Sequence, residues 1–336
     1  MQMGDALQRL LRAAHSGPFG RRAAARAGSP RILVVGVCQG AAVARAMRYL
    51  LPEAEVTTIS AFHLRRRFRR LADLVAEAGR HDVVFANTYL PAFPDGGAGE
   101  FHAAAAVKLL PTVVFSAFHP DQVRVGDLAD PNLKGLLTGP MGHSHSALAL
   151  FGYLEGLSVD ATERLFRGEV YAGLGYLDGW DGSVLGQRTL GQEVGWDLDA
   201  EIRRWALRGC FMHCDNHPKM HVLSDLARLA LRRAGIPFTD CDLDSYLPDD
   251  QGEIGCWPVY PEIAEYYGVP GSALFLSPRS RRLGPARTMT RRRFLDGAFA
   301  GYRSTPSSQL VCERVAGWRA DPETRGYLRQ AAGLSR

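Results

Sequence analysis

Short apolar runs separated by longer amphipathic stretches make up the first part of the chain. A β-branched run at residues 32–35 leads through a glycine-containing turn into a stretch with the apolar periodicity of a helix, ending near Leu51. The alternation continues, with strands predicted at 55–60, 82–86 and 112–116 and helices predicted at 61–79 and 100–109. Strands that alternate with helices favour a parallel, doubly wound sheet, so the predicted fold class is α/β.

Beyond residue 139 the pattern becomes mainly helical. Apolar positions at helical spacing predict a helix ending at 154 and further helices at 159–166, 197–208 and 219–234, whereas 173–195 shows little periodicity. We therefore expect three parts: a flexible leader over 1–30, a small α/β part over 31–138, and a mainly helical part over 139–336 that packs on it.

The composition is that of a soluble globular protein, with 46% hydrophobic and 22% charged residues in 336. No run approaches the roughly 20 apolar residues of a membrane span, and the first thirty residues lack the apolar core of a secretory signal. Six cysteines are too few for a dense disulfide framework at this length, so we expect reduced thiols and a cytoplasmic location. The net charge of +5 suits an anionic small molecule or a nucleic acid and does not separate the two.

A cysteine occupies the first predicted strand-to-helix turn, at residues 36–40. The start of a helix presents N–H groups and the positive end of its dipole, and both favour a thiolate there. Cys38 is therefore a candidate nucleophile, the alternative being a small buried residue that closes the turn. In doubly wound sheets ligands bind beyond the carboxyl ends of the strands, and Asn87 and His119 follow two other predicted strands. This convergence of polar groups favours the nucleophile hypothesis.

Several histidines are candidates for a base. His119 lies in a loop fixed by Pro120 and followed by Asp121, and an imidazole within hydrogen-bond reach of a thiol acts as a general base. The alternative for His119 is a loop histidine satisfied by the backbone. His143 and His145, two residues apart at the start of a predicted helix, are each weaker candidates.

A second cluster of cysteines and histidines lies at residues 210–221. Structural zinc sites use two separated ligand pairs, and this spacing fits no such site, so no metal is expected. The turn Asn216-His217-Pro218, followed by Lys219 at a predicted helix start, is better suited to an anion. The arginine-rich stretches 65–70 and 279–293 are interpreted either as solvated faces or as phosphate-binding patches. No P-loop or dinucleotide-binding glycine motif is present in the sequence.

Three short motifs, in this order, resemble those of the WcbI family of capsular polysaccharide biosynthesis proteins. The matching residues are Gly36, Cys38 and Gln39, then Phe118, His119 and Pro120, then Asn216, His217 and Pro218. The resemblance spans residues 31–234. It implies a small α/β part with a mainly helical remainder, binding of coenzyme A, and acetyl-CoA-dependent O-acetylation of a sugar. Val37 stands where the family has asparagine, so a hydrogen bond from that asparagine would have to come from Gln39 or Asn87.

The resulting hypothesis is transfer of an acetyl or related acyl group from acyl-CoA to a hydroxyl of a sugar or polysaccharide precursor, with no nucleic-acid partner. Cys38 is the predicted nucleophile or thioester-positioning thiol, with His119 as the first and His217 as the second candidate base. The predicted oxyanion- or substrate-binding residues are Gln39, Gly40, Asn87, Asp121, His143 and Asn216. The predicted CoA-binding residues are Lys219, Arg65, Arg66, Arg279 and Arg281. Two alternatives stay open: a cysteine-dependent deacylase acting on a glycan or thioester, and a non-catalytic protein that binds anionic glycans or nucleic acid.

Overall fold

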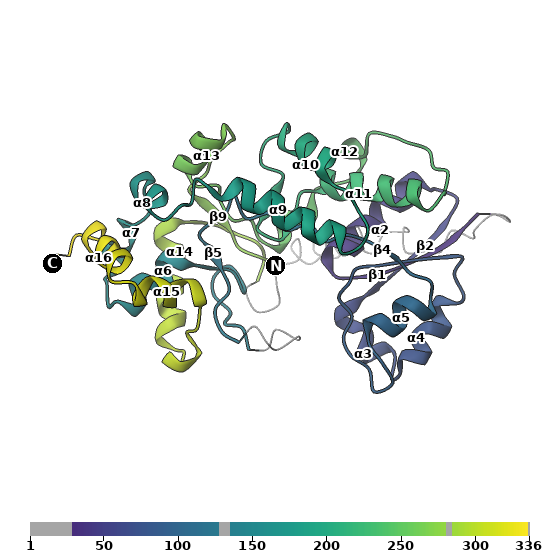
Figure 1. Cartoon of the computed structure of the whole chain (residues 1–336), viewed down its shortest axis with the longest axis horizontal. Coiled ribbons are helices and arrows are strands. Elements are labelled where there is room, and N and C mark those ends of the chain that lie inside the picture. The colour runs from purple at the N-terminus through teal and green to yellow at the C-terminus, as the bar shows by residue number, and fades with distance from the viewer. Residues whose placement is uncertain (1–28, 128–134, 280–283, 335–336) are drawn as a thin grey trace, which may run out of the picture. The chain divides into compact units, whose positions relative to one another are not determined.

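The structure is a computed structural model that describes residues 29–127, 135–279 and 284–334 (Figure 1). The chain forms two compact units. One comprises the described residues up to Lys108 together with Ala230–Cys241, and the other comprises Leu109–Leu229 and the described residues from Asp242 onward. The division near residue 139 expected from the sequence falls inside the second unit, and most of the predicted leader lies outside the described residues.

The first unit is built on a four-stranded sheet with the strand order β2-β1-β3-β4. Its strands are β1 (Arg31–Gly36), β2 (Glu55–Ser60), β3 (Val83–Ala86) and β4 (Lys108–Leu109). β1 pairs in parallel with both β2 and β3, with Gly36 beside Ser60 and Val35 beside Ala86. The chain thus leaves β1 to one side and then crosses back to form β3 on the other, so the strand order reverses beside β1. The predicted α/β fold class is confirmed.

Both faces of this sheet are covered, which explains why its strands are apolar on both sides. The helices that share one apolar cluster are α3 (Leu64–Arg67), α4 (Leu71–Ala78) and α5 (Ala98–Ala104), which Figure 1 shows together on one side of the strands. Leu33 and Val35 of β1 belong to that cluster. The intervening Val34 is also fully buried and faces α2 (Cys38–Leu50), because a side-chain carbon added at Gly40 would lie 3.9 Å from its Cγ1.

Two predicted helices differ from the structure. The one predicted over 61–79 is a 3-10 turn, η2 (Ala61–His63), followed by α3 and, after a break at Phe68, by α4. A carboxylate from a later loop stabilises the break. Asp95 accepts hydrogen bonds from the N–H groups of Leu71 (2.6 Å) and Ala72 (3.1 Å), which a continuous helix would bond internally. Of the helix predicted over 100–109, only the residues up to Ala104 are helical and belong to α5. Its last two residues form β4.

The prediction of a strand at 112–116 is wrong. A side chain satisfies the backbone of this segment: Gln187 accepts a hydrogen bond from the Val114 N–H (2.8 Å) and donates one to the Thr112 carbonyl (3.0 Å). Gln187 belongs to α9 (Gly179–Gln192), a helix in the segment whose sequence shows little periodicity. The position beside β3 is occupied by β4 instead.

The second unit is mainly helical, as predicted. Besides α9, its helices include α6 (Ala147–Leu154), α7 (Val159–Glu163), α8 (Gly168–Gly173), α10 (Asp199–Ala206), α12 (Leu243–Tyr246), α13 (Pro261–Tyr267), α14 (Arg291–Arg303), α15 (Glu313–Ala320) and α16 (Pro322–Ala331), with the short 3-10 helices η3 (Asp250–Ile254) and η4 (Ser307–Gln309). Its antiparallel strand pairs are β5 (Gln122–Val123) with β6 (His145–Ser146), β7 (Met212–Cys214) with β8 (His217–Pro218), and β9 (Leu274–Leu276) with β10 (Thr288–Thr290). Within the described ranges, none of the helices has the length and apolar character needed to span a membrane.

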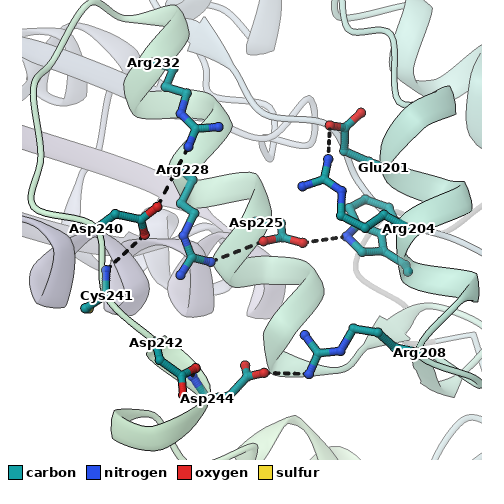
Figure 2. Close-up of polar contacts among 11 residues, drawn as sticks. Glu201, Arg204, Arg208, Asp225, Arg228, Arg232, Asp240, Cys241, Asp242 and Asp244 are labelled. Carbon is teal, nitrogen blue, oxygen red and sulfur yellow. Dashed lines mark hydrogen bonds and ion pairs between the residues drawn. The ribbon is translucent and has the colours of Figure 1, made fainter.

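The helix α11 (Met220–Arg233) begins directly after the hairpin β7–β8 and is anchored to α10. Asp225 of α11 accepts a hydrogen bond from Nε1 of Trp205 (3.0 Å). It also pairs with Arg228 (3.2 Å), as Figure 2 shows. Arg208, just after α10, pairs with Asp244 (2.5 Å). The Asp225–Trp205 bond thus holds the middle of α11 against α10, and the Arg208–Asp244 pair joins the end of α10 to α12.

Candidate functional site

Cys38 is the first residue of α2, directly after β1 and the capping residue Val37. It therefore stands at the carboxyl end of β1, beside the carboxyl end of β3, where the strand order of the sheet reverses. The first N–H bond inside α2 runs from Ala41 to the Val37 carbonyl (3.1 Å), so the N–H groups of Cys38, Gln39 and Gly40 lie at the N-terminal end of the helix. This is the position that the sequence predicts for the thiol.

Asn87 lies beneath this turn. Its N–H donates to the Val35 carbonyl (3.2 Å), and its side chain is buried. Its Oδ1 packs against both glycines of the turn: a side-chain carbon added at Gly40 would lie 2.6 Å from this oxygen, and one added at Gly36 would lie closer still. Among the described residues, Oδ1 has no hydrogen-bond partner. A buried acceptor of this kind is a candidate contact for a donor on a ligand.

Gly40→Ala should destabilise the first unit by about 1–3 kcal/mol, because the added methyl group must displace the Asn87 amide. Gly79→Ala is the matched control, since its added carbon would have no neighbour closer than 3.6 Å and its φ is an ordinary −63°. Thermal unfolding followed by circular dichroism measures both. Combining Gly40→Ala with Asn87→Ala should recover part of the loss; an additive double variant would show that Asn87 is not the group displaced.

The resting form of Cys38 is the thiol. Burial raises the pKa of Cys38, and the N–H groups of Gln39 and of Cys38 itself oppose the rise without outweighing it. The helix start is expected to favour the thiolate and so to lower the pKa of Cys38. The pKa is raised instead, because desolvation of this half-buried residue is the larger effect. A base must remove the proton before this sulfur can attack.

His119 and Asp121 both lie in the interior of the second unit. His119 is 2% exposed, and burial lowers its pKa to about 4. Asp121 is fully buried, and its carboxylate accepts hydrogen bonds from the hydroxyls of Tyr176 (3.1 Å) and Tyr260 (2.9 Å) and from the N–H of Leu148 (3.0 Å). These bonds fix the loop that carries His119. A substrate-binding role for Asp121 stays a prediction.

The hairpin β7–β8 carries Asn216 and His217. Nδ1 of His217 lies 3.0 Å from Sγ of Cys214, and the same sulfur lies 3.4 Å from Oδ1 of Asn216. Burial lowers the pKa of His217 to about 4 and raises that of Cys214 to about 12, so both side chains are neutral near pH 7. The predicted helix start at this turn is displaced, because His217 and Pro218 form β8 and α11 begins after Lys219.

Two of the predicted phosphate-binding arginines follow β2. Arg65 and Arg66 are exposed residues of α3, which the short turn η2 connects to the carboxyl end of that strand. The guanidinium of Arg65 donates to the carbonyl of Ala92 and lies 5.3 Å from the ring centroid of Phe93. Both residues thus stand at the same edge of the sheet as Cys38.

The other predicted ligand-binding residues are in the second unit. Arg279 is exposed and pairs with Glu253 (3.3 Å), while Arg281 lies outside the described residues. His143 is exposed, with Nδ1 3.3 Å from the Leu137 carbonyl. Across the described ranges, no group of three or more histidine, cysteine or acidic side chains is arranged to hold a metal ion.

A polar cavity of about 1300 Å³ opens in the second unit. Its lining includes Arg124, Asp215 and Arg314, and Arg124 pairs with Asp215 (2.9 Å). Gln122, also in the lining, donates a second hydrogen bond to the Asp215 carboxylate (2.9 Å). Charged and amide groups that converge in a cavity of this size suit a polar ligand such as a sugar.

Sequence reasoning missed one group of chemically active side chains. Cys256, His213 and Asp249 of the second unit are in contact, although only His213 lies in the cluster recognised from the sequence. The spacing carries no signal for this group, because its members come from β7, from the loop before η3 and from the segment after it.

Comparison with known proteins agrees with the resemblance inferred from the motifs. The sequence model of a family described as "polysaccharide biosynthesis enzyme WcbI" matches residues 31–239. The fold is similar to a solved structure of WcbI, itself described as a novel polysaccharide biosynthesis enzyme, with a TM-score of 0.64 and 14% identity, covering 90% of this chain and 99% of that chain. That structure is of the native protein without a disulfide bond between coenzyme A and one of its cysteines. No curated protein matches the chain. Since the family match covers more than half of its residues, the chain belongs to the WcbI family of polysaccharide biosynthesis enzymes.

Proposed function

We propose that this enzyme transfers an acetyl or related acyl group from an acyl-CoA thioester to a hydroxyl of a sugar or polysaccharide precursor. The observation that carries the proposal is the placement of Cys38 on the first turn of α2, at the point where the strand order reverses and above the buried amide of Asn87. The solved WcbI structure supports it in that its description, as the native protein without a disulfide bond between coenzyme A and one of its cysteines, names coenzyme A together with a cysteine.

The first turn of α2 supplies the groups that acyl transfer needs. The sulfur of Cys38, once deprotonated, attacks the thioester carbonyl, or it holds the thioester while the sugar hydroxyl attacks. In both routes negative charge develops on the carbonyl oxygen, and the N–H groups of Gln39 and Gly40 are placed to stabilise it. One such donor is typically worth about 3 kcal/mol of barrier.

The base is assigned to one of the two motif histidines. Burial lowers the pKa of His119 and of His217 to about 4, so both rings are neutral at pH 7 but are weak bases, and either would need bound substrate to raise its pKa toward the working pH. His119 is the first choice, because the His217 ring is already in contact with Cys214 (3.0 Å). The polar cavity around Arg124 and Asp215 is assigned to the acceptor sugar.

Titration of the full chain with CoA tests the donor side of the proposal. We expect saturable binding by calorimetry, and several-fold weaker binding in Arg66→Ala, because this cation stands beyond the carboxyl end of β2, beside the turn that bears the thiol. Arg80→Ala is the matched control: it is an exposed arginine of the same unit, but it precedes β3 and therefore lies at the opposite edge of the sheet.

The outcomes separate the competing functions. Absence of CoA binding, together with salt-sensitive binding of an anionic polysaccharide, would contradict the proposal and favour a non-catalytic binding protein. Release of acetate from acetyl-CoA without an acceptor, at the rate of turnover, would favour a deacylase.

A further inference from the structure

Three side chains of the second unit form a cysteine–histidine–aspartate arrangement. Sγ of Cys256 lies 3.4 Å from Nδ1 of His213, and the other ring nitrogen of His213, Nε2, lies 3.0 Å from Oδ2 of Asp249. A thiol bonded to an imidazole that is oriented by a carboxylate is the arrangement of nucleophilic acyl-transfer sites. The geometry therefore supplies a nucleophile, a base and an orienting group without any part of the Cys38 turn.

The electrostatic state of His213 agrees with this arrangement. Burial by itself would lower its pKa, but the hydrogen bonds to Asp249 and Cys256 outweigh burial and raise the pKa of His213 to about 9. A protonated imidazole donates from both nitrogens, which matches the carboxylate of Asp249 on one side and the sulfur of Cys256 on the other. A histidine cation beside a cysteine favours the thiolate form of that cysteine.

The pair Cys214–His217 provides an internal comparison. Its sulfur-to-nitrogen distance is 3.0 Å, shorter than that of Cys256–His213, yet burial leaves both of its members neutral, with pKa values of about 12 and about 4. Contact between a cysteine and a histidine is therefore not enough for activation in this unit. The feature that distinguishes His213 is Asp249.

The site is both rigid and accessible. The backbone of Cys256 is bonded in both directions to Leu276 of β9 (2.9 and 3.0 Å), and the N–H of Trp257 donates to the His213 carbonyl (2.7 Å). The side chain of His213 is 14% exposed, that of Asp249 is 35% exposed, and Cys256 is half-buried. The residue that bears the sulfur is thus partly open to solvent, while the imidazole stays largely shielded.

We propose that Cys256, His213 and Asp249 form a second nucleophilic site, in which Cys256 accepts an acyl group from a thioester or another activated ester. The Cys256 sulfur, its proton held by Nδ1 of His213, attacks the carbonyl carbon and forms a carbon–sulfur bond. The bond from carbon to the leaving group then breaks, and the leaving group takes the proton from His213. The products are S-acyl Cys256 and a free thiol or alcohol. Asp249 acts as a positioning residue, and the site does not depend on acyl transfer at Cys38.

The test measures the reactivity of each cysteine in the full chain. Iodoacetamide labelling between pH 5 and 9, quantified by peptide mass spectrometry, gives the rate at Cys256 beside those at Cys241 and Cys312, which are also half-buried. We expect Cys256 to react about 10-fold faster than these two at pH 6, because a histidine cation lies beside its sulfur and would stabilise the charge that develops there. We also expect acetylation of Cys256 by p-nitrophenyl acetate and by acetyl-CoA.

Two variants probe the assigned roles. His213→Gln should lower the labelling rate of Cys256 to that of Cys241 and Cys312. The buried Cys214 should be labelled slowly in every protein. Asp249→Asn, at a more exposed position than His213, should keep the fold and slow the labelling of Cys256 at pH 6, because His213 then holds its proton less tightly. The other titratable groups near this site, which include His119, His217, Cys210 and Lys219, are unchanged in both variants.

Three results would overturn the proposal. They are labelling of Cys256 no faster than that of Cys241 and Cys312, an unchanged labelling profile in both folded variants, and fast labelling without acetylation by either donor. Peptide mapping assigns each adduct to its own cysteine, so failure of acylation at Cys256 is not mistaken for failure at Cys38.

Discussion

Asp121→Ala should lower the free energy of unfolding of the second unit by about 4 kcal/mol or more. The substitution leaves the hydroxyls of Tyr176 and Tyr260 and the N–H of Leu148 without their acceptor in a fully buried environment. Each buried donor left unsatisfied costs about 1–3 kcal/mol. Urea unfolding followed by tryptophan fluorescence measures the loss, because all five tryptophans of the chain belong to the second unit.

Two variants set the scale for this effect. Asp199→Ala also removes a carboxylate that accepts two hydrogen bonds, both from Arg188, but at the surface, and should cost about 1 kcal/mol or less. Asp121→Asn keeps one acceptor oxygen, so its loss of unfolding free energy should lie between those of Asp121→Ala and Asp199→Ala. Equal losses in Asp121→Ala and Asp199→Ala would show that the tyrosine hydroxyls find other partners and that Asp121 does not hold the core together.

The pH dependence of stability gives a second check on Asp121. Burial raises the pKa of Asp121, so the folded protein holds a proton on this carboxyl more tightly than the unfolded chain does. The contribution of Asp121 to stability therefore falls as the pH rises from the ordinary carboxyl pKa through the raised value. Asp121→Asn does not titrate, so the difference in stability between the two proteins should change over this range.

The fold could be predicted from the sequence where the backbone hydrogen bonds of an element are those of a regular helix or strand and its buried face consists of apolar side chains. β1, β2 and α11 are such elements. α9 is not, because the side it buries consists of Ser183, Gln187 and Gly191, so hydrophobic periodicity has nothing to detect. The break before α4 has a similar cause: it depends on Asp95, from another part of the chain, bonding to two N–H groups of the helix.

The candidate site could be predicted only in part, for the same physical reason. A strand, a glycine turn and a helix are contiguous in sequence, so the placement of Cys38 follows from local pattern. Its protonation state does not, because desolvation by surrounding residues decides it. The contact of Cys256 with His213 joins residues 43 apart in sequence, and no local spacing encodes it.

Cys38→Ala should reduce acyl transfer from acetyl-CoA by at least about 1000-fold, the scale on which enzymes lose activity when the nucleophile is removed. The substitution should affect the chemical step and not the fold, because it removes the reacting sulfur of a half-buried residue and leaves the turn intact. We therefore expect kcat to fall while the affinity for CoA, measured by calorimetry, stays within a few-fold of the original. Cys241→Ala, at the other half-buried cysteine of the first unit, is the matched control and should retain full transfer.

Cys38→Ser separates the two ways in which the thiol takes part. If Cys38 carries the acyl group, the hydroxyl is a far weaker nucleophile and Cys38→Ser should be nearly as inactive as Cys38→Ala. If the sugar hydroxyl attacks the bound thioester directly, a hydrogen-bonding serine should retain much of the rate that alanine loses. Full transfer by Cys38→Ala with intact CoA binding would contradict both routes. The first turn of α2 would then act through its N–H groups alone. The raised pKa of Cys38 would in that case belong to a thiol that stays protonated and takes no part in the reaction.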